Sequence, residues 1–215
     1  MKSTTIALVL LLFVAAATVA AAAQTPQWKN ADYDAVRDFS SQSNPNGVWS
    51  YGWESTFAGP LTLYTGVGSC ETPGISWWYL ACQTQPVLGH NDTDKVVCYY
   101  DFCLPPTYLL LHPGPAGEFS VLRWTAPSSG VFLVEGTFVG IATAPTTTDV
   151  HVLVNSKNSL LSGPITSYGW PLSFKLKGKV VAGDTVDFLV GFGKEGNNGS
   201  DSTGVRFSLT RMGQH

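Results

Sequence analysis

The chain has 215 residues, with 12 Lys or Arg against 15 Asp or Glu, and its formal net charge is −3 at pH 7. Recognition of nucleic-acid phosphates needs a basic stripe, and the sequence shows none, so a nucleic-acid partner is not expected. Only 13% of the residues are charged whereas 12% are aromatic. The composition therefore provides enough apolar material for a folded core and leaves a surplus of tryptophans to explain.

Residues 1–23 have the pattern of a secretory signal peptide. An early lysine precedes an apolar run over about residues 6–20, and small residues follow it, which is typical of a cleaved export signal. We expect cleavage before Gln24, a secreted protein in the extracellular space or at a cell wall, and no membrane span afterwards. A retained anchor helix is the alternative, because the run is close to the minimum length that spans a bilayer. Residues 24–215 fit a single domain.

The first predicted strand, residues 48–54, carries aromatic side chains at every second position: Trp49, Tyr51 and Trp53. The Asn-Pro-Asn-Gly sequence before it is typical of a tight turn. Side chains alternate along a strand, so the three rings share one face. Facing inward they would fill a core, which is the favoured interpretation. Facing outward they would form a platform that stacks on sugar rings.

Four cysteines follow: Cys70, Cys82, Cys98 and Cys103. In an exported chain an even number of cysteines predicts disulfides, here two, and three pairings are possible. Pairing of neighbours, Cys70 with Cys82 and Cys98 with Cys103, is favoured because it closes short loops. The spacing does not match that of zinc sites. We therefore expect a disulfide-stapled region over residues 70–103.

Trp77 and Trp78 are adjacent within a predicted strand over residues 75–80. Neighbouring residues of a strand face opposite sides, so one of the two tryptophans is expected at the surface. An exposed aromatic face bordered by short polar groups is suited to carbohydrate. The alternative is that these rings only pack the stapled region onto the rest of the domain.

Further strands are expected in chain order at 61–65, 95–100, 107–111, from 119, along the run after Gly130, and at 148–155, 173–181, 184–193 and 203–211. In the run after Gly130, Phe132 and Phe138 share one face. In the strand over 173–181, Lys175, Lys177 and Lys179 share one face, which is therefore expected to be exposed to solvent. About eight to eleven antiparallel strands without helical periodicity predict an all-β jelly-roll sandwich of two sheets.

Tyr168 and Trp170 lie in a Gly-containing segment before Pro171. Loops at the ends of a sandwich are frequent binding sites. We therefore expect carbohydrate contacts first at Trp77 or Trp78 together with Tyr168 and Trp170, and second at the aromatic row of residues 49–53.

No cofactor is predicted with certainty, but a structural calcium ion is considered, because calcium prefers oxygen ligands from loops. Asp92 and Asp94 are closely spaced, and the oxygen-rich segment 193–204 contains Asp201. The segment around Asp92 and Asp94 lacks the glycine and the distal glutamate of an EF-hand loop. A solvated turn is the alternative interpretation at both places.

The sequence has no G-x-S-x-G, H-E-x-x-H, P-loop or dinucleotide motif. His112 and His151 are interpreted as turn or sheet-face residues rather than catalytic bases. Glycoside hydrolysis would need two carboxylates, for which Glu118 and Glu135 are candidates. Enzymatic activity is therefore not predicted, and a polysaccharide-degrading enzyme ranks third among the functions considered.

Four segments carry a resemblance to a known family: NPNGVWSYGW, LHPGPAGEFSVLRWTAPSSGVFLVEGTF, TDVHVLVN and VVAGDTVDFLVGFG. In this order they resemble a jelly-roll module of secreted bacterial proteins, many of which carry a PEP-CTERM sorting tail. The similarity covers about residues 36–211 and implies a galactose-binding-like β-sandwich exported to the cell surface. This chain has no such tail, and the stapled region departs from the pattern. The chain is similar, more loosely, to wall lectins secreted by protists.

Together these features predict a secreted, non-catalytic module that binds polysaccharide or glycan in a cell wall or extracellular matrix. The alternative from another class is a structural or adhesive surface protein that binds other proteins.

Overall fold

The computed structural model describes residues 31–82 and 84–213, so the predicted signal peptide lies outside the described residues. The described part contains sixteen strands and no helix, and hence no helix able to span a membrane. The strands are β1 (Tyr33–Asp34), β2 (Trp49–Glu54), β3 (Thr62–Leu63), β4 (Gly66–Gly68), β5 (Ile75–Tyr79), β6 (Val87–Asn91), β7 (Val97–Tyr99), β8 (Phe102–Leu104), β9 (Leu109–His112), β10 (Phe119–Thr125), β11 (Gly130–Gly140), β12 (Asp149–Val154), β13 (Asn158–Pro164), β14 (Pro171–Val180), β15 (Thr185–Gly191) and β16 (Thr203–Arg211).

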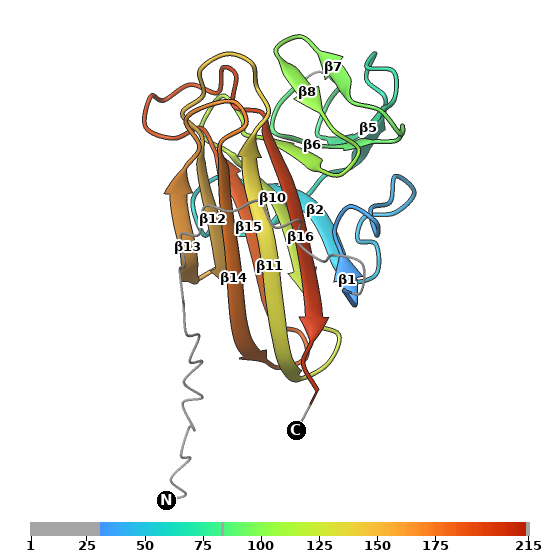
Figure 1. Cartoon of the computed structure of the whole chain (residues 1–215), viewed down its shortest axis with the longest axis vertical. Coiled ribbons are helices and arrows are strands. Elements are labelled where there is room, and N and C mark those ends of the chain that lie inside the picture. The colour runs from blue at the N-terminus through green and yellow to red at the C-terminus, as the bar shows by residue number, and fades with distance from the viewer. Residues whose placement is uncertain (1–30, 83, 214–215) are drawn as a thin grey trace, which may run out of the picture.

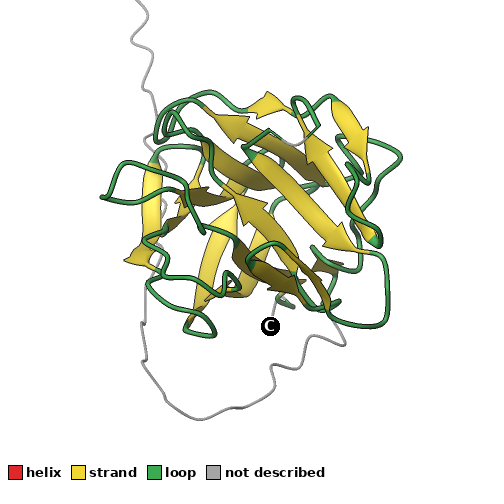
Figure 2. Ribbon diagram, turned by 90° about the horizontal axis from the view of Figure 1, so that it is seen from above, coloured by secondary structure: helices red, strands yellow, loops and turns green. Residues whose placement is uncertain are grey.

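Two antiparallel sheets pack face to face as a jelly-roll β-sandwich (Figures 1 and 2). The larger sheet has the order β14-β11-β16-β9-β6-β5-β4, with β1 also paired to β16, and the smaller has the order β13-β12-β15-β10-β2-β3. A separate hairpin consists of β7 and β8. Eleven of the strands have four or more residues, which agrees with the predicted number; the others are short additions at sheet edges and in the hairpin.

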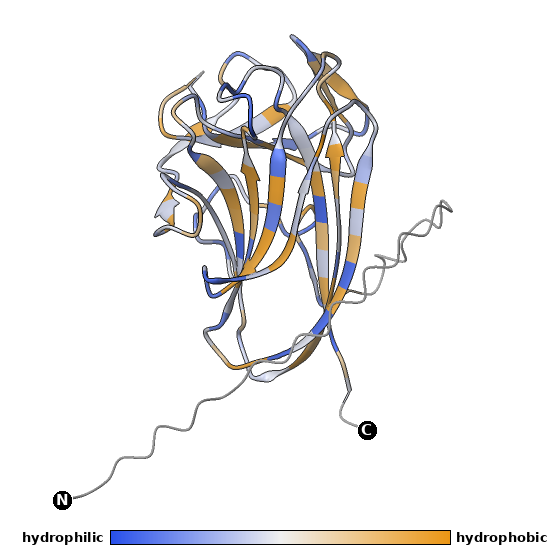
Figure 3. Ribbon diagram, turned by 90° about the vertical axis from the view of Figure 1, so that its left-hand side faces the viewer, coloured by the Kyte–Doolittle hydropathy of each residue, from blue (hydrophilic) through white to orange (hydrophobic). Residues whose placement is uncertain are grey.

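The longest strands follow the predicted alternation of apolar and polar residues (Figure 3). On β11, Phe132 and Phe138 are buried in the core between the sheets. On its partner β14, Lys175, Lys177 and Lys179 are exposed while Leu176 is buried. The period of two places every second side chain toward the other sheet, and the burial of these apolar side chains stabilises the pair.

Aromatic side chains from both sheets fill the core. Phe188 on β15 stacks on Phe207 on β16, with ring centroids 3.8 Å apart and an interplanar angle of 10°. Trp124 on β10 packs edge to face against Phe132 at 5.1 Å. Because each pair joins the two sheets, these contacts fix the distance between them.

The sequence did not predict two of the longer strands. β6 contains Gly89 and His90 within five residues, and β13 has the sequence Asn-Ser-Leu-Leu-Ser-Gly-Pro, which lacks a two-residue period. β6 is a strand because it pairs with β5 and β9 on its two sides. β13 pairs only with β12, at the edge of its sheet. Tertiary pairing overrides weak local preference at both places.

Candidate functional site

A second, smaller core lies on the outer face of the larger sheet. Trp77 on β5 and Leu110 on β9 belong to it and pack with Phe102 of the β7–β8 hairpin. The backbone N–H of Cys103 donates to the Ile141 carbonyl oxygen at 3.1 Å, which ties the hairpin to the end of β11. The hairpin therefore covers part of the sheet that would otherwise face water, at one end of the sandwich (Figure 1).

Two disulfides hold this region together. Cys70 is bonded to Cys82 and Cys98 to Cys103, which confirms the favoured pairing of neighbours. Cys98 and Cys103 lie opposite each other in the hairpin, so their bond joins β7 to β8 beside the turn. Each disulfide closes a short loop, and both loops contribute side chains to the same cavity.

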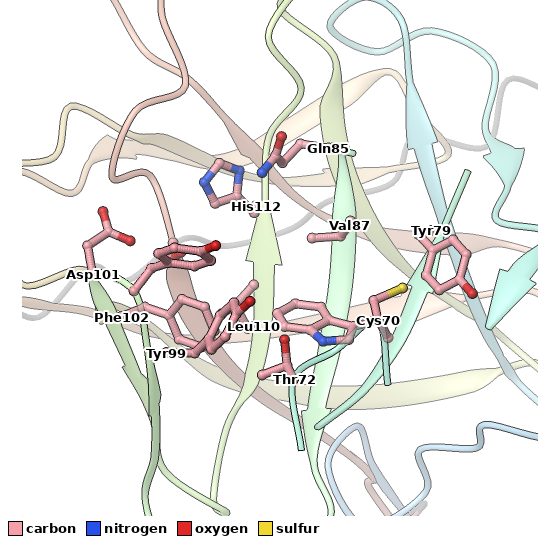
Figure 4. A pocket seen from close by; sticks show the side chains of 13 residues that line it. Cys70, Thr72, Tyr79, Gln85, Val87, Tyr99, Asp101, Phe102, Leu110 and His112 are labelled. Carbon is pink, nitrogen blue, oxygen red and sulfur yellow. The ribbon is translucent and has the colours of Figure 1, made fainter. Parts of the chain in front are cut away.

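The cavity has a volume of about 290 Å³ and lies between the hairpin and the outer face of β5, β6 and β9. Five of its side chains are aromatic: Trp77, Tyr79, Tyr99, Tyr100 and Phe102. Figure 4 shows Tyr99 and Phe102 on one side of the cavity and Tyr79 on the other, with His112 and Gln85 nearby. The volume is close to the lower end of small-molecule sites, roughly 300–1,000 Å³.

Tyr100 forms the open rim of this cavity. Its side chain is 91% exposed, and its ring packs edge to face against Tyr99 with centroids 4.4 Å apart. Its φ of 48° lies in the left-handed region, which a bulky residue rarely adopts. Such backbone strain persists where surrounding structure imposes it, and it concentrates at ligand sites. The two-residue turn thus holds a large aromatic ring in water.

Two of the residues that line the cavity have a ring nitrogen without a hydrogen-bond partner among the described residues. The Trp77 indole N–H is buried and has no hydrogen-bond partner among the described residues. His112 Nδ1 lies 2.9 Å from the Pro113 carbonyl oxygen, which only accepts, so Nδ1 carries the hydrogen. Burial lowers the pKa of His112. At neutral pH its Nε2 is therefore an unprotonated acceptor.

The charge of the lining residues restricts the ligand. Asp101, at the tip of the hairpin, is the one carboxylate among them, and the described lining includes no Lys or Arg. A negatively charged ligand would meet the Asp101 charge without a compensating cation. The site is accordingly suited to neutral or positively charged molecules.

The aromatic row on β2 is not a binding surface. Trp49 and Tyr51 are 1% and 0% exposed and belong to the core between the sheets, and Trp53 is half-buried against the same core. The interpretation of this row as core is confirmed. Its possible role as an outward platform for sugar is wrong, because β2 turns these rings toward the larger sheet.

Trp77 and Trp78 face opposite sides of β5 as predicted, but the expectation that one is at the surface is wrong. Trp78 lies in the sandwich core, where its ring stacks on Tyr51 at 5.9 Å and its N–H donates to the Ser40 carbonyl oxygen. Trp77 packs edge to face on Phe102 at 6.0 Å. The hairpin covers Trp77, and strand alternation alone cannot show this. Trp77 nevertheless lines the cavity.

Tyr168 and Trp170 are 57% and 61% exposed, in the loop between β13 and β14. The Gly169 N–H donates to the Gly140 carbonyl oxygen at 2.8 Å, which anchors this loop to the end of β11. Both rings are therefore accessible to a ligand. They do not line the cavity, and a contact of theirs with sugar stays a prediction.

The three aspartates considered as calcium ligands have different surroundings. Asp92 accepts a hydrogen bond from Ser76 and pairs with His90, and Asp94 is exposed. Asp201 is fully buried; Thr146, Thr147 and Thr148 all donate to its Oδ1. In the described part of the chain, no three His, Cys, Asp or Glu residues are grouped around a possible ion. Calcium binding stays a prediction.

The glutamates considered for hydrolysis have other partners. Glu135 forms an ion pair with Lys175 at 2.8 Å, and Glu118 accepts a hydrogen bond from the Ala116 backbone N–H. The structure places neither of them in the aromatic cavity.

Two other carboxylates approach each other through a shared cation. Arg123 on β10 forms paired hydrogen bonds with Asp187 on β15 and lies 3.8 Å from a Glu54 oxygen. Both carboxylates are fully buried. Burial, and then the neighbouring Asp187 charge, raise the pKa of Glu54 to about 7, although Arg123 opposes this shift. Because both carboxylates are buried, neither presents a surface to which a ligand could bind.

Comparison with known proteins gives no match to any family model and none to a curated protein sequence. Among solved structures, the chain is similar to the N-terminal cellulose-binding domain of Cellulomonas fimi β-1,4-glucanase C, with 12% identity, 72% of this chain and 99% of that chain covered, and a TM-score of 0.34. It is also similar to a family 35 carbohydrate-binding module from Clostridium thermocellum, with 18% identity, coverage of 54% and 82%, and a TM-score of 0.33.

A third similar structure is TmCBM61 in complex with β-1,4-galactotriose, with 18% identity, coverage of 49% and 70%, and a TM-score of 0.32. All three neighbours are carbohydrate-binding modules or domains. The strand pairing of the chain itself defines its two-sheet sandwich.

Proposed function

We propose that this protein is a secreted module that binds carbohydrate in the cavity beneath the β7–β8 hairpin, and that this cavity binds its ligand without catalysing a reaction. One observation carries the proposal: five aromatic side chains line the cavity, and one of them, Trp77, has a buried indole N–H without a hydrogen-bond partner among the described residues. Aromatic faces pack against the apolar C–H faces of sugar rings, and a few fixed polar groups select the hydroxyls. Trp77 supplies the donor, and His112 the acceptor.

The size and charge of the cavity restrict the class of ligand that it can bind. A volume of about 290 Å³ suits one or two sugar units of a chain rather than a long segment. Asp101 without a nearby cation disfavours uronic acids and sulfated sugars. The ligand class is therefore a neutral sugar unit of a polysaccharide or glycan, held from one side by Tyr99 and Phe102 and from the other by Tyr79.

The proposal is tested by retention of the purified protein on insoluble cellulose, chitin and mannan, with tryptophan fluorescence recorded alongside. Trp77→Phe keeps an aromatic ring beside Phe102 but removes the N–H, and Tyr100→Ser removes the exposed rim ring. We expect retention by the wild-type protein and a fluorescence shift on binding. Both variants should lose at least about tenfold in affinity, equivalent to about 1.4 kcal/mol.

Phe57→Ala is the matched control, because Phe57 is an exposed aromatic residue outside the cavity. It should bind as the wild-type protein does. Absence of retention on every matrix, with or without added calcium, would overturn the proposal and favour the structural or adhesive role. Retention unaffected by the two cavity variants but lost in Trp170→Ala would move the site to the β13–β14 loop.

A further inference from the structure

A serine, a histidine and an aspartate form a continuous hydrogen-bonded series on the outer face of the smaller sheet. Ser162 Oγ on β13 lies 2.9 Å from His151 Nδ1 on β12, and His151 Nε2 lies 2.8 Å from Asp149 Oδ2 on the same strand. His151 and Ser162 are directly paired across the two strands. His151 was predicted to be a turn or sheet-face residue; cross-strand pairing, which the sequence did not predict, adds Ser162 as a partner to Asp149 on its own strand.

The donors in this series follow from its chemistry. The Asp149 carboxylate only accepts hydrogen bonds, so His151 Nε2 carries the hydrogen that it receives. In the neutral ring Nδ1 is then an acceptor, and the Ser162 hydroxyl donates to it. With the ring in this neutral form, the Ser162 proton points at Nδ1, which is the arrangement that activates a serine nucleophile.

The surroundings hold the imidazole in this orientation. The Gly193 backbone N–H donates to the second Asp149 oxygen at 2.8 Å, which fixes the carboxylate. The rings of Phe57 and Phe119 pack on His151 with centroids 4.6 and 5.9 Å away. His151 is 8% exposed, whereas Ser162 is exposed. The base is therefore shielded while the hydroxyl that it polarises is open to a reagent.

We infer that Ser162 is a nucleophilic site that accepts acyl groups from carboxylic esters, with His151 as its general base and Asp149 as a positioning residue. Ser162 Oγ forms a bond to the ester carbonyl carbon while its proton moves to His151 Nδ1. The ester C–O bond then breaks, and the proton passes from Nδ1 to the leaving alcohol. Water, activated by the same nitrogen, hydrolyses acyl-Ser162 to release the acid and restore the serine.

This site is separate from the aromatic cavity, since none of these three residues lines it, so its test does not depend on carbohydrate binding. The full protein is incubated with a fluorophosphonate probe and, separately, with p-nitrophenyl acetate, and the modified peptide is identified by mass spectrometry. We expect modification at Ser162, and its loss in Ser162→Ala. Ser159 is the matched internal control, because it lies on the same strand and donates to the Leu161 carbonyl oxygen instead of a histidine.

His151→Phe retains a ring between Phe57 and Phe119 and removes the base. It should slow modification of Ser162 at least about 100-fold. Asp149→Asn should slow it too and should change the ¹⁵N signals of the His151 ring, which report its tautomer. Labelling of Ser162 that is no faster than that of Ser159, or that persists in folded His151→Phe protein, would overturn the inference.

Discussion

Trp77 and Trp78 are neighbours in the chain but belong to two different cores. Trp78 packs between the two sheets, and Trp77 packs between the larger sheet and the β7–β8 hairpin. β5 is therefore covered on both faces, although it lies next to the end of its sheet. The second core converts a sheet face into a cavity, so the stability of the sandwich and the integrity of the cavity depend on different contacts.

The positive φ of Tyr100 is expected to lower the free energy of unfolding, because a bulky residue rarely adopts this conformation. Tyr100→Asn places a residue that tolerates positive φ in the turn, and the free energy of unfolding should stay equal or rise by about 0.5–1 kcal/mol. Carbohydrate retention should fall in the same variant, because the exposed ring is lost. Urea denaturation and the retention assay measure the two effects; a clear loss of stability would contradict the assignment of strain to this turn.

Loss of the Cys98–Cys103 disulfide should disrupt the cavity but leave the two-sheet sandwich folded. The Cys98–Cys103 bond closes a loop of a few residues that carries Tyr99, Tyr100 and Phe102, and the entropy model assigns such a loop roughly 2 kcal/mol. In Cys98→Ser/Cys103→Ser protein we expect lost ligand binding with an unchanged far-ultraviolet circular dichroism spectrum. Global unfolding of this variant at room temperature would show that the hairpin is needed for the sandwich as well.

The raised pKa of Glu54 predicts that the free energy of unfolding depends on pH. Its pKa is raised to about 7 in the folded protein, first by burial and then by Asp187, so the folded state binds the proton more tightly than the unfolded chain. The contribution of Glu54 protonation to the free energy of unfolding is fully present below the unfolded pKa of about 4.3. As the pH rises to about 7 this contribution is lost, and the free energy of unfolding falls by up to roughly 3 kcal/mol.

Glu54→Gln tests this assignment, because the amide has nearly the same shape and does not titrate. Denaturation between pH 4.5 and 7.5 should show a decline in the wild-type protein that is flatter in the variant. Parallel curves for the two proteins would assign the pH dependence to other groups.

Gly136 on β11 leaves room for two rings of the core. A methyl group at this position would overlap the rings of Phe174 and Phe207, and neither ring can move without disturbing its own contacts. Gly136→Ala should therefore lower the free energy of unfolding by about 1–3 kcal/mol. Gly213→Ala, in open space, is the control and should leave the unfolding midpoint unchanged.

The sequence predicted those parts of the fold that depend on local patterns. The two-residue period identified β11 and β14, and the aromatic spacing on β2 indicated the core. The nearness of Cys98 to Cys103 indicated their bond. These predictions are correct because each depends on residues that are only a few positions apart in the chain.

The candidate site depended on contacts between distant segments, which local patterns do not report. Trp77 lines a cavity only because residues 97–104 fold back over it. The hydrogen bond between His151 and Ser162 needs β13, which has no strand-like alternation. One local signal was available: Cys-Tyr-Tyr-Asp-Phe-Cys places two tyrosines within a short cysteine-bounded loop, where they have little chance of burial.

The lysine stripe on β14 has a consequence for how copies of the chain meet. β14 is an edge strand, and its outer side presents unpaired backbone groups to which another sheet can add. Lys175, Lys177 and Lys179 would bring like charges together in such a pairing, and Pro171 at the start of the strand has no N–H to offer. This edge therefore disfavours the addition of a strand from another copy and growth into a continuous intermolecular sheet.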